Sequence, residues 1–197
     1  LIEQPMAAAI GANLPINEPR GSMVIDIGGG TSESAILSLG GVVSLQAVRV
    51  GSFDIDATIQ SFIRKEYGIA IGEQTAEKIK ITMGSAFPTA EEFRAEVRGR
   101  ELMAGLPKTV VLSPEEIRNA IEAPLGTIGD SGVACLGEAP PELAQDLIVE
   151  GIHLVGGGGL LRGLPERLTA ETDVQVKLVD LPLESVVLGA GRCIESY

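Results

Sequence analysis

A short apolar strand that runs into three consecutive glycines is the feature that most constrains the fold of this chain. The run from Val24 to Thr31 reads Val-Ile-Asp-Ile-Gly-Gly-Gly-Thr, so the strand delivers the carboxylate of Asp26 into a tight turn. Gly28, Gly29 and Gly30 allow the backbone to approach an anion closely, and Thr31 adds a hydroxyl. The pattern predicts a phosphate-binding turn, and a glycine-rich hairpin after a buried strand is the alternative.

A second strand that ends in glycines lies far downstream. Residues 152–155 form a short apolar run, and four glycines, Gly156 to Gly159, follow it directly. Leucines then recur at helical spacing from Leu160 to Leu168, which predicts that the glycine loop leads into a helix. The N–H groups at a helix start favour anions or polar edges of a ligand. Neither glycine run has the spacing of a P-loop or of a Rossmann dinucleotide fingerprint.

The composition narrows the classes of partner. The 197 residues, 45% of them hydrophobic, suffice for one sizeable core, or for a core with a small inserted subdomain. A net charge of −12 without a cluster of lysine and arginine argues against a nucleic-acid partner. Cys135 and Cys193 lack a metal-binding spacing and are interpreted as packing residues in a reducing compartment. No apolar run reaches the ~20 residues of a transmembrane helix, and no signal peptide is recognised.

Hydrophobic periodicity predicts an alternating α/β order. Three strands open it, the last two joined by a two-residue turn at Gly40 and Gly41; they are expected at Ser22–Ile27, Ser34–Leu39 and Val42–Val50. Further along, the predicted elements are a helix over residues 55–67, a strand at 152–155, a helix over 160–168, a strand at 174–179 and a last helix from Leu183. Residues 69–112 are expected to hold a helix and a short polar hairpin between these two groups.

A helix start is predicted at Ser113, with Pro114 in the first helical position and Glu116 completing a capping box. The segment after Pro124 contains four glycines, at positions 126, 129, 132 and 137. Each interior glycine costs ~1 kcal/mol relative to alanine, so these residues are expected to interrupt and weaken the helix.

With these motifs in place, the chain resembles the actin, Hsp70 and sugar-kinase superfamily, and within it the MreB family of bacterial actins. The segments that carry the resemblance occur in the family's order and are Leu1–Gly11, Asp26–Thr31, Ile71–Glu73, Thr75–Glu77, Ile79–Lys80, Glu96–Arg100, Pro140–Ala144 and Gly156–Gly163. The resemblance covers essentially the whole chain and corresponds to the C-terminal half of such a protein, so the first residue, Leu1, suggests a fragment.

The resemblance implies an α/β fold, namely a ribonuclease-H-like actin-type ATPase lobe with three antiparallel strands plus βαβα, and a small inserted α+β subdomain. Residues 1–20 would then end the first lobe and form a hinge helix and linker. Residues 21–52 and 113–197 would form the nucleotide-binding subdomain, and residues 53–112 the inserted one.

The resemblance also implies roles for individual residues with ATP and Mg as cofactors. Asp26 would hold Mg through water, and Thr31 would lie near the attacking water. The other residues expected to contact the nucleotide are Gly28, Gly29, Gly30, Thr31 and Gly51 around the phosphates, Gly156, Gly157 and Gly158 at the adenosine, and Glu77 and Lys80 at the adenine and ribose. Without the resemblance, Glu77 and Lys80 are interpreted as an ordinary solvated face.

Three positions depart from or limit this scheme. Gln4 stands where MreB and Hsp70 relatives place glutamate, and an amide orients water but is a poor base, so slow hydrolysis is expected. Asp56 matches the acid of the family's G-G-x-x-x-D motif, but Ser52 replaces its second glycine, which weakens the expectation at Gly51. His153 lies in an apolar strand and is interpreted as a core or edge residue.

The function implied is the second lobe of a bacterial actin that binds ATP and Mg and polymerises into filaments that control rod shape. The implied partners are further copies of the chain, the membrane and cell-wall elongation proteins, and the implied location is the cytoplasm at the inner face of the membrane. Three alternatives remain open: an Hsp70-type chaperone ATPase, which would need a β-rich substrate domain, a small-molecule kinase, and a scaffold that does not hydrolyse nucleotide.

Overall fold

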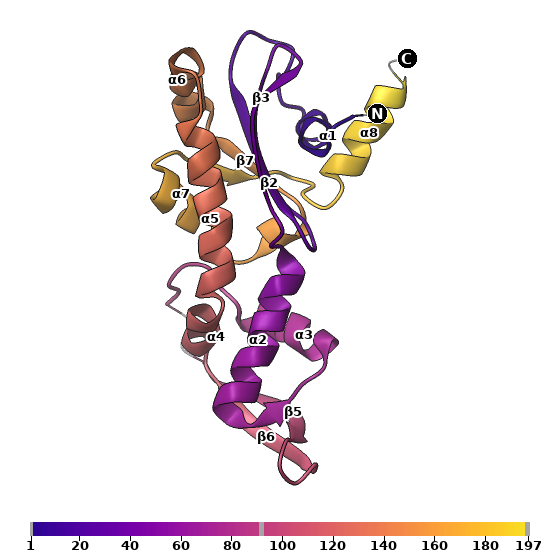
Figure 1. The fold of residues 1–197 in the computed structure, drawn as a ribbon, viewed down its shortest axis with the longest axis vertical. Coiled ribbons are helices and arrows are strands. Elements are labelled where there is room, and N and C mark those ends of the chain that lie inside the picture. The colour runs from indigo at the N-terminus through magenta and orange to yellow at the C-terminus, as the bar shows by residue number, and fades with distance from the viewer. Residues whose placement is uncertain (1, 91–92, 196–197) are drawn as a thin grey trace.

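The computed structural model describes residues 2–90 and 93–195, which form two sheets and the helices around them (Figure 1). The helices, including the 3-10 turn η1, are α1 (Gln4–Gly11), α2 (Ser52–Tyr67), α3 (Glu73–Met83), α4 (Pro114–Ala120), α5 (Glu122–Gly137), α6 (Pro141–Glu150), η1 (Gly157–Leu160), α7 (Leu164–Thr172) and α8 (Ser185–Glu195). The strands are β1 (Ser22–Ile27), β2 (Ser32–Ser38), β3 (Gly41–Val48), β4 (Ile69–Ala70), β5 (Ala95–Glu101), β6 (Pro107–Leu112), β7 (Ile152–Val155) and β8 (Val176–Leu178).

The larger sheet has five strands in the order β3-β2-β1-β7-β8. The first three strands form an antiparallel meander, and β7 and β8 extend it in parallel with β1. This is the predicted arrangement of three antiparallel strands followed by βαβα. The observed strands lie within one or two residues of the predicted bounds, and β1 and β7 match them.

The alternation of β1 assigns its side chains to two cores, because successive residues of a strand point to opposite faces of the sheet. Met23, Ile25 and Ile27 pack in the larger core, on the face covered by α5 and α7. Val24 packs in a smaller core with α1, and Asp26 follows two residues later in the same strand. Figure 1 shows α1 and α8 on one side of this sheet and α5, α6 and α7 on the other.

The hairpin between β2 and β3 turns one residue earlier than predicted. Ser38 pairs with Gly41, so Leu39 and Gly40 are the two central turn residues, and both have positive φ angles, 50° and 73°. A two-residue turn of this kind needs positive φ at both positions, which glycine adopts without strain. The second glycine, Gly41, is therefore the first strand residue and not part of the turn.

The smaller sheet, β4-β5-β6, lies at the far end of α2 from the larger one, with α3 and α4 beside α2 (Figure 1). The capping box predicted at Ser113 is present: the Ser113 hydroxyl accepts from the Glu116 N–H, and the Glu116 carboxylate accepts from the Ser113 N–H. The carboxylate of Glu116 also accepts from the Tyr67 hydroxyl, and this bond raises the pKa of Tyr67 to about 12. The cap thus ties α4 to the end of α2.

The glycines of α5 do not interrupt it, and the expectation of a broken helix is wrong. The helix runs continuously from Glu122 to Gly137. A Cβ at Gly129 would lie 1.8 Å from the Glu171 carboxylate, and one at Gly132 would lie 3.1 Å from the Ile25 side chain. Two of the four glycines therefore allow close packing against α7 and the sheet, which offsets the propensity that they cost.

The segment after β7 also differs from the prediction of one helix over 160–168. The glycines themselves form the 3-10 turn η1, the chain breaks at Gly163, which has a φ of 72°, and α7 then starts at Leu164. Leu161, Leu164 and Leu168 are still buried together in the larger core. The leucine spacing indicated burial correctly but did not show that η1 ends at Leu160 and that a new helix, capped by Gly163, starts at Leu164.

Candidate functional site

The two glycine turns lie side by side because β1 and β7 are adjacent parallel strands that end at the same edge of the sheet. Asp26 is in register with Val155, and Gly156 follows directly with a φ of 83°. A Cβ on Gly156 would lie 2.4 Å from Asp26 Oδ1 and 2.4 Å from the Ile27 carbonyl oxygen. Ligands of open α/β sheets bind outside the carboxyl ends of such strands, so this edge is the candidate site.

The first residues of α2 hydrogen-bond to the turn from Gly28 to Thr31. Its own hydrogen bond runs from the Gly28 N–H to the Thr31 carbonyl, at 2.9 Å. The N–H groups of Ser52 and Phe53 donate to the carbonyls of Gly28 and Gly29, at 2.9 and 2.8 Å. Among the described residues, the N–H groups of Gly29 and Gly30 have no backbone acceptor. The carbonyls of the turn are therefore used by the protein, while two of its donors remain for a ligand.

Gly51 packs directly against the first glycine turn, although a serine follows it. A Cβ on Gly51 would lie 2.6 Å from the Gly29 carbonyl oxygen and 2.7 Å from that of Gly28. Only glycine lets the start of α2 approach the turn this closely. The Asp54 carboxylate accepts from the Gly51 N–H at 2.8 Å and fixes the backbone there.

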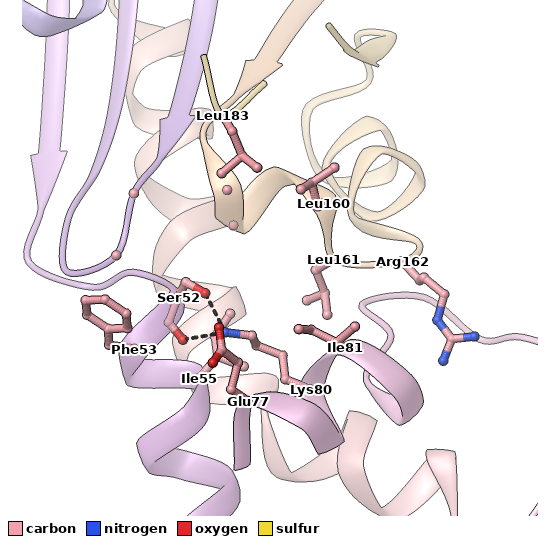
Figure 2. Close-up of a pocket in the computed structure, with 14 residues that line it drawn as sticks. Ser52, Phe53, Ile55, Glu77, Lys80, Ile81, Leu160, Leu161, Arg162 and Leu183 are labelled. Carbon is pink, nitrogen blue, oxygen red and sulfur yellow. Dashed lines mark hydrogen bonds between the residues drawn. The ribbon is translucent and has the colours of Figure 1, made fainter. Parts of the chain in front are cut away.

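A cavity of about 490 Å³ opens between the glycine turns and α3 (Figure 2). The residues that line it are Gly28, Gly29, Ser52, Phe53, Ile55, Glu77, Lys80, Ile81, Gly157, Gly158, Leu160, Leu161, Arg162 and Leu183. Its size and its mixture of apolar side chains with a few polar groups are typical of a small-molecule site.

Six of the predicted contact residues line this cavity, and the others lie beside it. Gly28, Gly29, Glu77, Lys80, Gly157 and Gly158 are in the lining. Gly30 and Thr31 are exposed at the outer end of the first turn, while Gly51 and Gly156 support the two turns from behind.

Asp26 is buried beneath the first turn, with 3% of its surface exposed. Its Oδ2 accepts a hydrogen bond of 2.9 Å from the Gln4 side-chain amide at the start of α1. Burial raises the pKa of this carboxyl, and the Gln4 hydrogen bond lowers it in part. The two predicted residues are thus direct neighbours, because Asp26 points to the face of the sheet that α1 covers.

Asp26 suits a magnesium site in which the protein supplies one carboxylate and the bound ligand supplies phosphate oxygens. Mg²⁺ keeps several waters and takes one or two carboxylates plus substrate phosphates. No group of three or more His, Cys, Asp or Glu residues that could hold a metal by themselves occurs in the described part of the chain. A single buried carboxylate next to a glycine turn suits a cation that arrives with a ligand.

Lys80 is not the solvated side chain that its sequence context suggests. It is 9% exposed, and its ammonium donates to Asp56 Oδ2 at 2.9 Å and to Ser52 Oγ at 2.6 Å. Burial raises the pKa of Asp56, and the hydrogen bond from Lys80 lowers it in part. Glu77, one helical turn earlier on α3, is exposed at the rim of the cavity.

The apolar wall and the arginine of the cavity were missed from the sequence. Ile81 and Leu160 are exposed at 66% and 50% and line the cavity from α3 and η1, with Leu161 drawn between them in Figure 2. The Arg162 guanidinium donates to the Thr82 and Gly84 carbonyls, at 2.8 and 3.3 Å, and so joins the second glycine segment to the end of α3. The signal for the apolar wall that the sequence did contain was a large apolar residue on the exposed face of a helix. Ile81 on α3 is such a residue.

His153 faces away from this site. It is half-buried in β7 and borders a separate cavity with Asn13 and Lys177. Burial, reinforced by the charge of Lys177, lowers the pKa of its imidazole. β7 lies between β1 and β8, so His153 is a half-buried residue of an inner strand.

The Gln4–Asp26 pair gives a prediction about stability. Gln4→Glu replaces the amide donor by an acceptor beside a buried carboxylate, so the two carboxyls can share a hydrogen bond only when one is protonated. A carboxyl pKa that is raised by folding contributes stability at low pH that is lost as the pH rises through the folded pKa. We expect the variant to lose about 1–3 kcal/mol of unfolding free energy at pH 8 and little at pH 4.

Urea denaturation at both pH values measures this effect. Gln74→Glu is the matched control, because Gln74 is exposed on α3 and the same substitution there should change stability by less than about 0.5 kcal/mol. A loss at Gln4 that is equal at pH 4 and pH 8 would contradict the direct carboxyl contact.

Comparison with solved structures identifies the class of this fold as actin-like. The ADP-bound crystal structure of MreB5 of Spiroplasma citri superimposes with a TM-score of 0.94 at 36% identity, over 99% of this chain and 59% of that chain. The same protein bound to AMPPNP gives a TM-score of 0.92. A filament structure of MamK, at 24% identity, shares the fold with a TM-score of 0.77.

Within this class, the chain belongs to the MreB/Mbl protein family, whose profile matches residues 1–197. It is 48% identical over 195 residues to the cell shape-determining protein MreB of Escherichia coli K12 and 37% identical over 196 residues to Mbl of Bacillus subtilis 168. The chain spans 56% and 59% of the lengths of these relatives. The predicted fold and family are confirmed.

Proposed function

We propose that this chain is the second lobe of a bacterial actin that binds ATP with Mg. The observation that carries the proposal is the meeting of the two glycine turns at one cavity, where Gly156 contacts Asp26 directly. The relatives that match nearly the whole chain at 36% identity are bound to ADP and to AMPPNP, which supports a nucleotide as the ligand.

The arrangement of the site supports a division of roles. The free N–H groups of Gly29 and Gly30 would bind phosphate oxygens, and Thr31 would lie toward the attacking water. Asp26 would hold Mg, which supplies positive charge to the phosphates when it is bound. Gly157 and Gly158 would lie against the adenosine, with the apolar wall of Ile81, Leu160 and Leu161 around the base.

We further propose that residues 21–52 and 113–197 form the nucleotide-binding subdomain and that 53–112 form an inserted one. The two separate sheets and the long α2 between them support this division. Residues 1–20 would end the first lobe and form a hinge helix and linker, which the contact of Gln4 on α1 with Asp26 and the greater length of the relatives support.

The cellular role that we propose is that of a cytoskeletal filament that controls rod shape at the inner face of the membrane and associates with cell-wall elongation proteins. Its support is the family, whose members include cell shape-determining proteins. No helix in residues 2–90 and 93–195 has the length and apolar character needed to cross a bilayer.

A scaffold that binds nucleotide without hydrolysing it is the second candidate, and Gln4 favours it. One N–H of the amide donates to Asp26, and the carbonyl oxygen can accept from a water, which orients the water but accepts a proton poorly. Hydrolysis by the complete protein would then be slow, while binding would be unaffected.

Titration calorimetry with Mg-ADP tests the proposed function. Ile81→Asp introduces a negative charge into the wall of the cavity and should weaken binding by at least about tenfold, which is 1.4 kcal/mol. Ile148→Asp is the matched control, because Ile148 on α6 has the same exposure of 66% and does not line the cavity. No binding to the unmodified chain, or equal losses in both variants, would contradict the nucleotide site.

A further inference from the structure

The peptide planes of the first glycine turn are oriented by the start of α2. The Ser52 N–H donates to the Gly28 carbonyl at 2.9 Å, and the Phe53 N–H donates to the Gly29 carbonyl at 2.8 Å. A trans peptide bond points its N–H group away from its own carbonyl, so these hydrogen bonds direct the N–H groups of Gly29 and Gly30 away from α2. Whatever fixes these two planes therefore also fixes the two donors that remain for a ligand.

The ring of Phe53 lies directly against one of these planes. The three heavy atoms nearest to a Cβ built on Gly29 all belong to this ring, at 2.6, 2.9 and 3.2 Å. The φ of Gly29 is not in the left-handed region, so its backbone conformation would accept a side chain. The Phe53 ring thus occupies the place that a side chain at position 29 would take.

Phe53 packs on the turn without belonging to a hydrophobic core. It is one of four phenylalanines in the chain, and neither core of the described residues includes it. It is 70% exposed and lines the cavity together with Gly28 and Gly29. Figure 2 shows its ring on the opposite side of the first turn of α2 from Lys80. Removing the ring should therefore affect the turn without unfolding the protein.

We propose that Phe53 is a positioning residue whose ring holds Gly29 so that the N–H groups of Gly29 and Gly30 stay aligned for phosphate oxygens. This inference rests on the proposed nucleotide site and gives a role to a residue that the sequence did not single out. The Phe53 N–H fixes the plane of the Gly29 carbonyl, and the ring opposes rotation of that plane. Hydrogen bonds weaken steeply when they are misaligned, so the effect is confined to ligands that carry phosphate.

Calorimetry with Mg-ADP and with adenosine separates this role from a general effect on the cavity. Phe53→Ala should weaken Mg-ADP about tenfold, which is the value of one charge-assisted hydrogen bond, and should change adenosine affinity less than about twofold. Phe53→Leu keeps a large side chain against Gly29 and should restore most of the affinity for Mg-ADP. Equal losses of both ligands in Phe53→Ala would overturn the proposal.

Phe93→Ala is the matched control, because Phe93 is also exposed, at 38%, and does not line the cavity. It should leave the affinity for Mg-ADP unchanged. In urea, the unfolding midpoints of Phe53→Ala and Phe93→Ala should both lie within about 0.3 M of that of the unmodified chain. A much lower midpoint for Phe53→Ala alone would show that the ring stabilises the fold as a whole, which contradicts the proposal.

Gly29→Ala tests the contact between the ring and the turn. The new Cβ would displace the Phe53 ring, so this variant should weaken Mg-ADP about as much as Phe53→Ala does. In the double variant the Cβ has room, and the loss should equal that of Phe53→Ala alone, because both substitutions remove the same contact. Additive losses would show that the ring does not act through Gly29.

Amide hydrogen exchange tests the positioning role without any ligand. Phe53→Ala should speed exchange of the Gly28 and Ser52 N–H groups at least about fivefold, because their acceptors lie in the turn, while Ile25 in β1 stays protected. Unchanged exchange at Gly28 and Ser52 would overturn the proposal. If exchange rises as expected but the unmodified chain binds neither ligand, the role of Phe53 in holding the turn is supported and the proposed nucleotide site is the part that fails.

Discussion

Replacing Gly156 by alanine should lower the free energy of unfolding by about 3 kcal/mol and abolish nucleotide binding. Two independent costs add at this position. The φ of 83° is strained for any residue with a side chain, and the new Cβ would lie 2.4 Å from both Asp26 Oδ1 and the Ile27 carbonyl oxygen. The Ile27 atom is backbone in the centre of the sheet, so it has little freedom to move aside.

Gly191→Ala is the control for this substitution. Gly191 lies within α8, and a Cβ there would meet no atom within 4 Å. Alanine at a free helical position should raise the unfolding free energy by about 0.5–1 kcal/mol. Urea denaturation of both variants gives the comparison. A loss below about 1 kcal/mol for Gly156→Ala would show that the two turns are not in the close contact described.

The parts of the site that local sequence determines were predictable. An apolar run that ends in glycines predicts a strand and a turn, and both β1 and β7 occur at their predicted residues. The capping box at Ser113 was equally local, because its partners are three residues apart. That the two turns would meet needed the resemblance, because 125 or more residues separate them and only the order of the parallel strands brings their ends together.

The features that were not predicted depend on contacts between distant elements. The glycines of α5 weaken a helix in isolation, but Gly129 and Gly132 lie where the Glu171 carboxylate of α7 and the Ile25 side chain of the sheet approach the helix closely. Lys80 has the pattern of a solvated helix face, yet Asp56 is 24 residues away in sequence and removes it from water. Propensity and periodicity describe one element at a time, so neither contact could be derived from them.

The Gln4–Asp26 contact was partly predictable from the sequence. The period of two in β1 places Asp26 on the same face as Val24, and that face packs against α1. Gln4 begins α1, so a side chain at that end of the helix can reach the carboxylate. The pairing thus follows from alternation once the face that α1 covers is known, and the missing information was the position of one helix.

The last prediction is that this chain alone releases phosphate from Mg-ATP at least about a thousandfold more slowly than a full-length MreB. Gly30 and Thr31 are exposed at the outer end of the first glycine turn, so the opposite side of phosphates bound there would be open to water. Phosphoryl transfer depends on positioning and on charge stabilisation around the transferred group, and removing even one preorganised donor costs about 100- to 1,000-fold in rate. The relatives have more than 40% of their length beyond the part that this chain matches, which is enough for an opposing lobe.

A phosphate-release assay on the purified chain, with full-length MreB of Escherichia coli measured in parallel, tests this expectation. The Ile81→Asp variant controls for contaminating ATPases, because activity that belongs to the site should fall with the charge in its wall, whereas contaminating activity should not. Binding of Mg-ADP is expected to remain, since both glycine turns and Asp26 lie within this chain. Turnover close to that of the full-length protein would show that one lobe supplies the complete catalytic site, and the proposed sharing of the phosphates between two lobes would then be wrong.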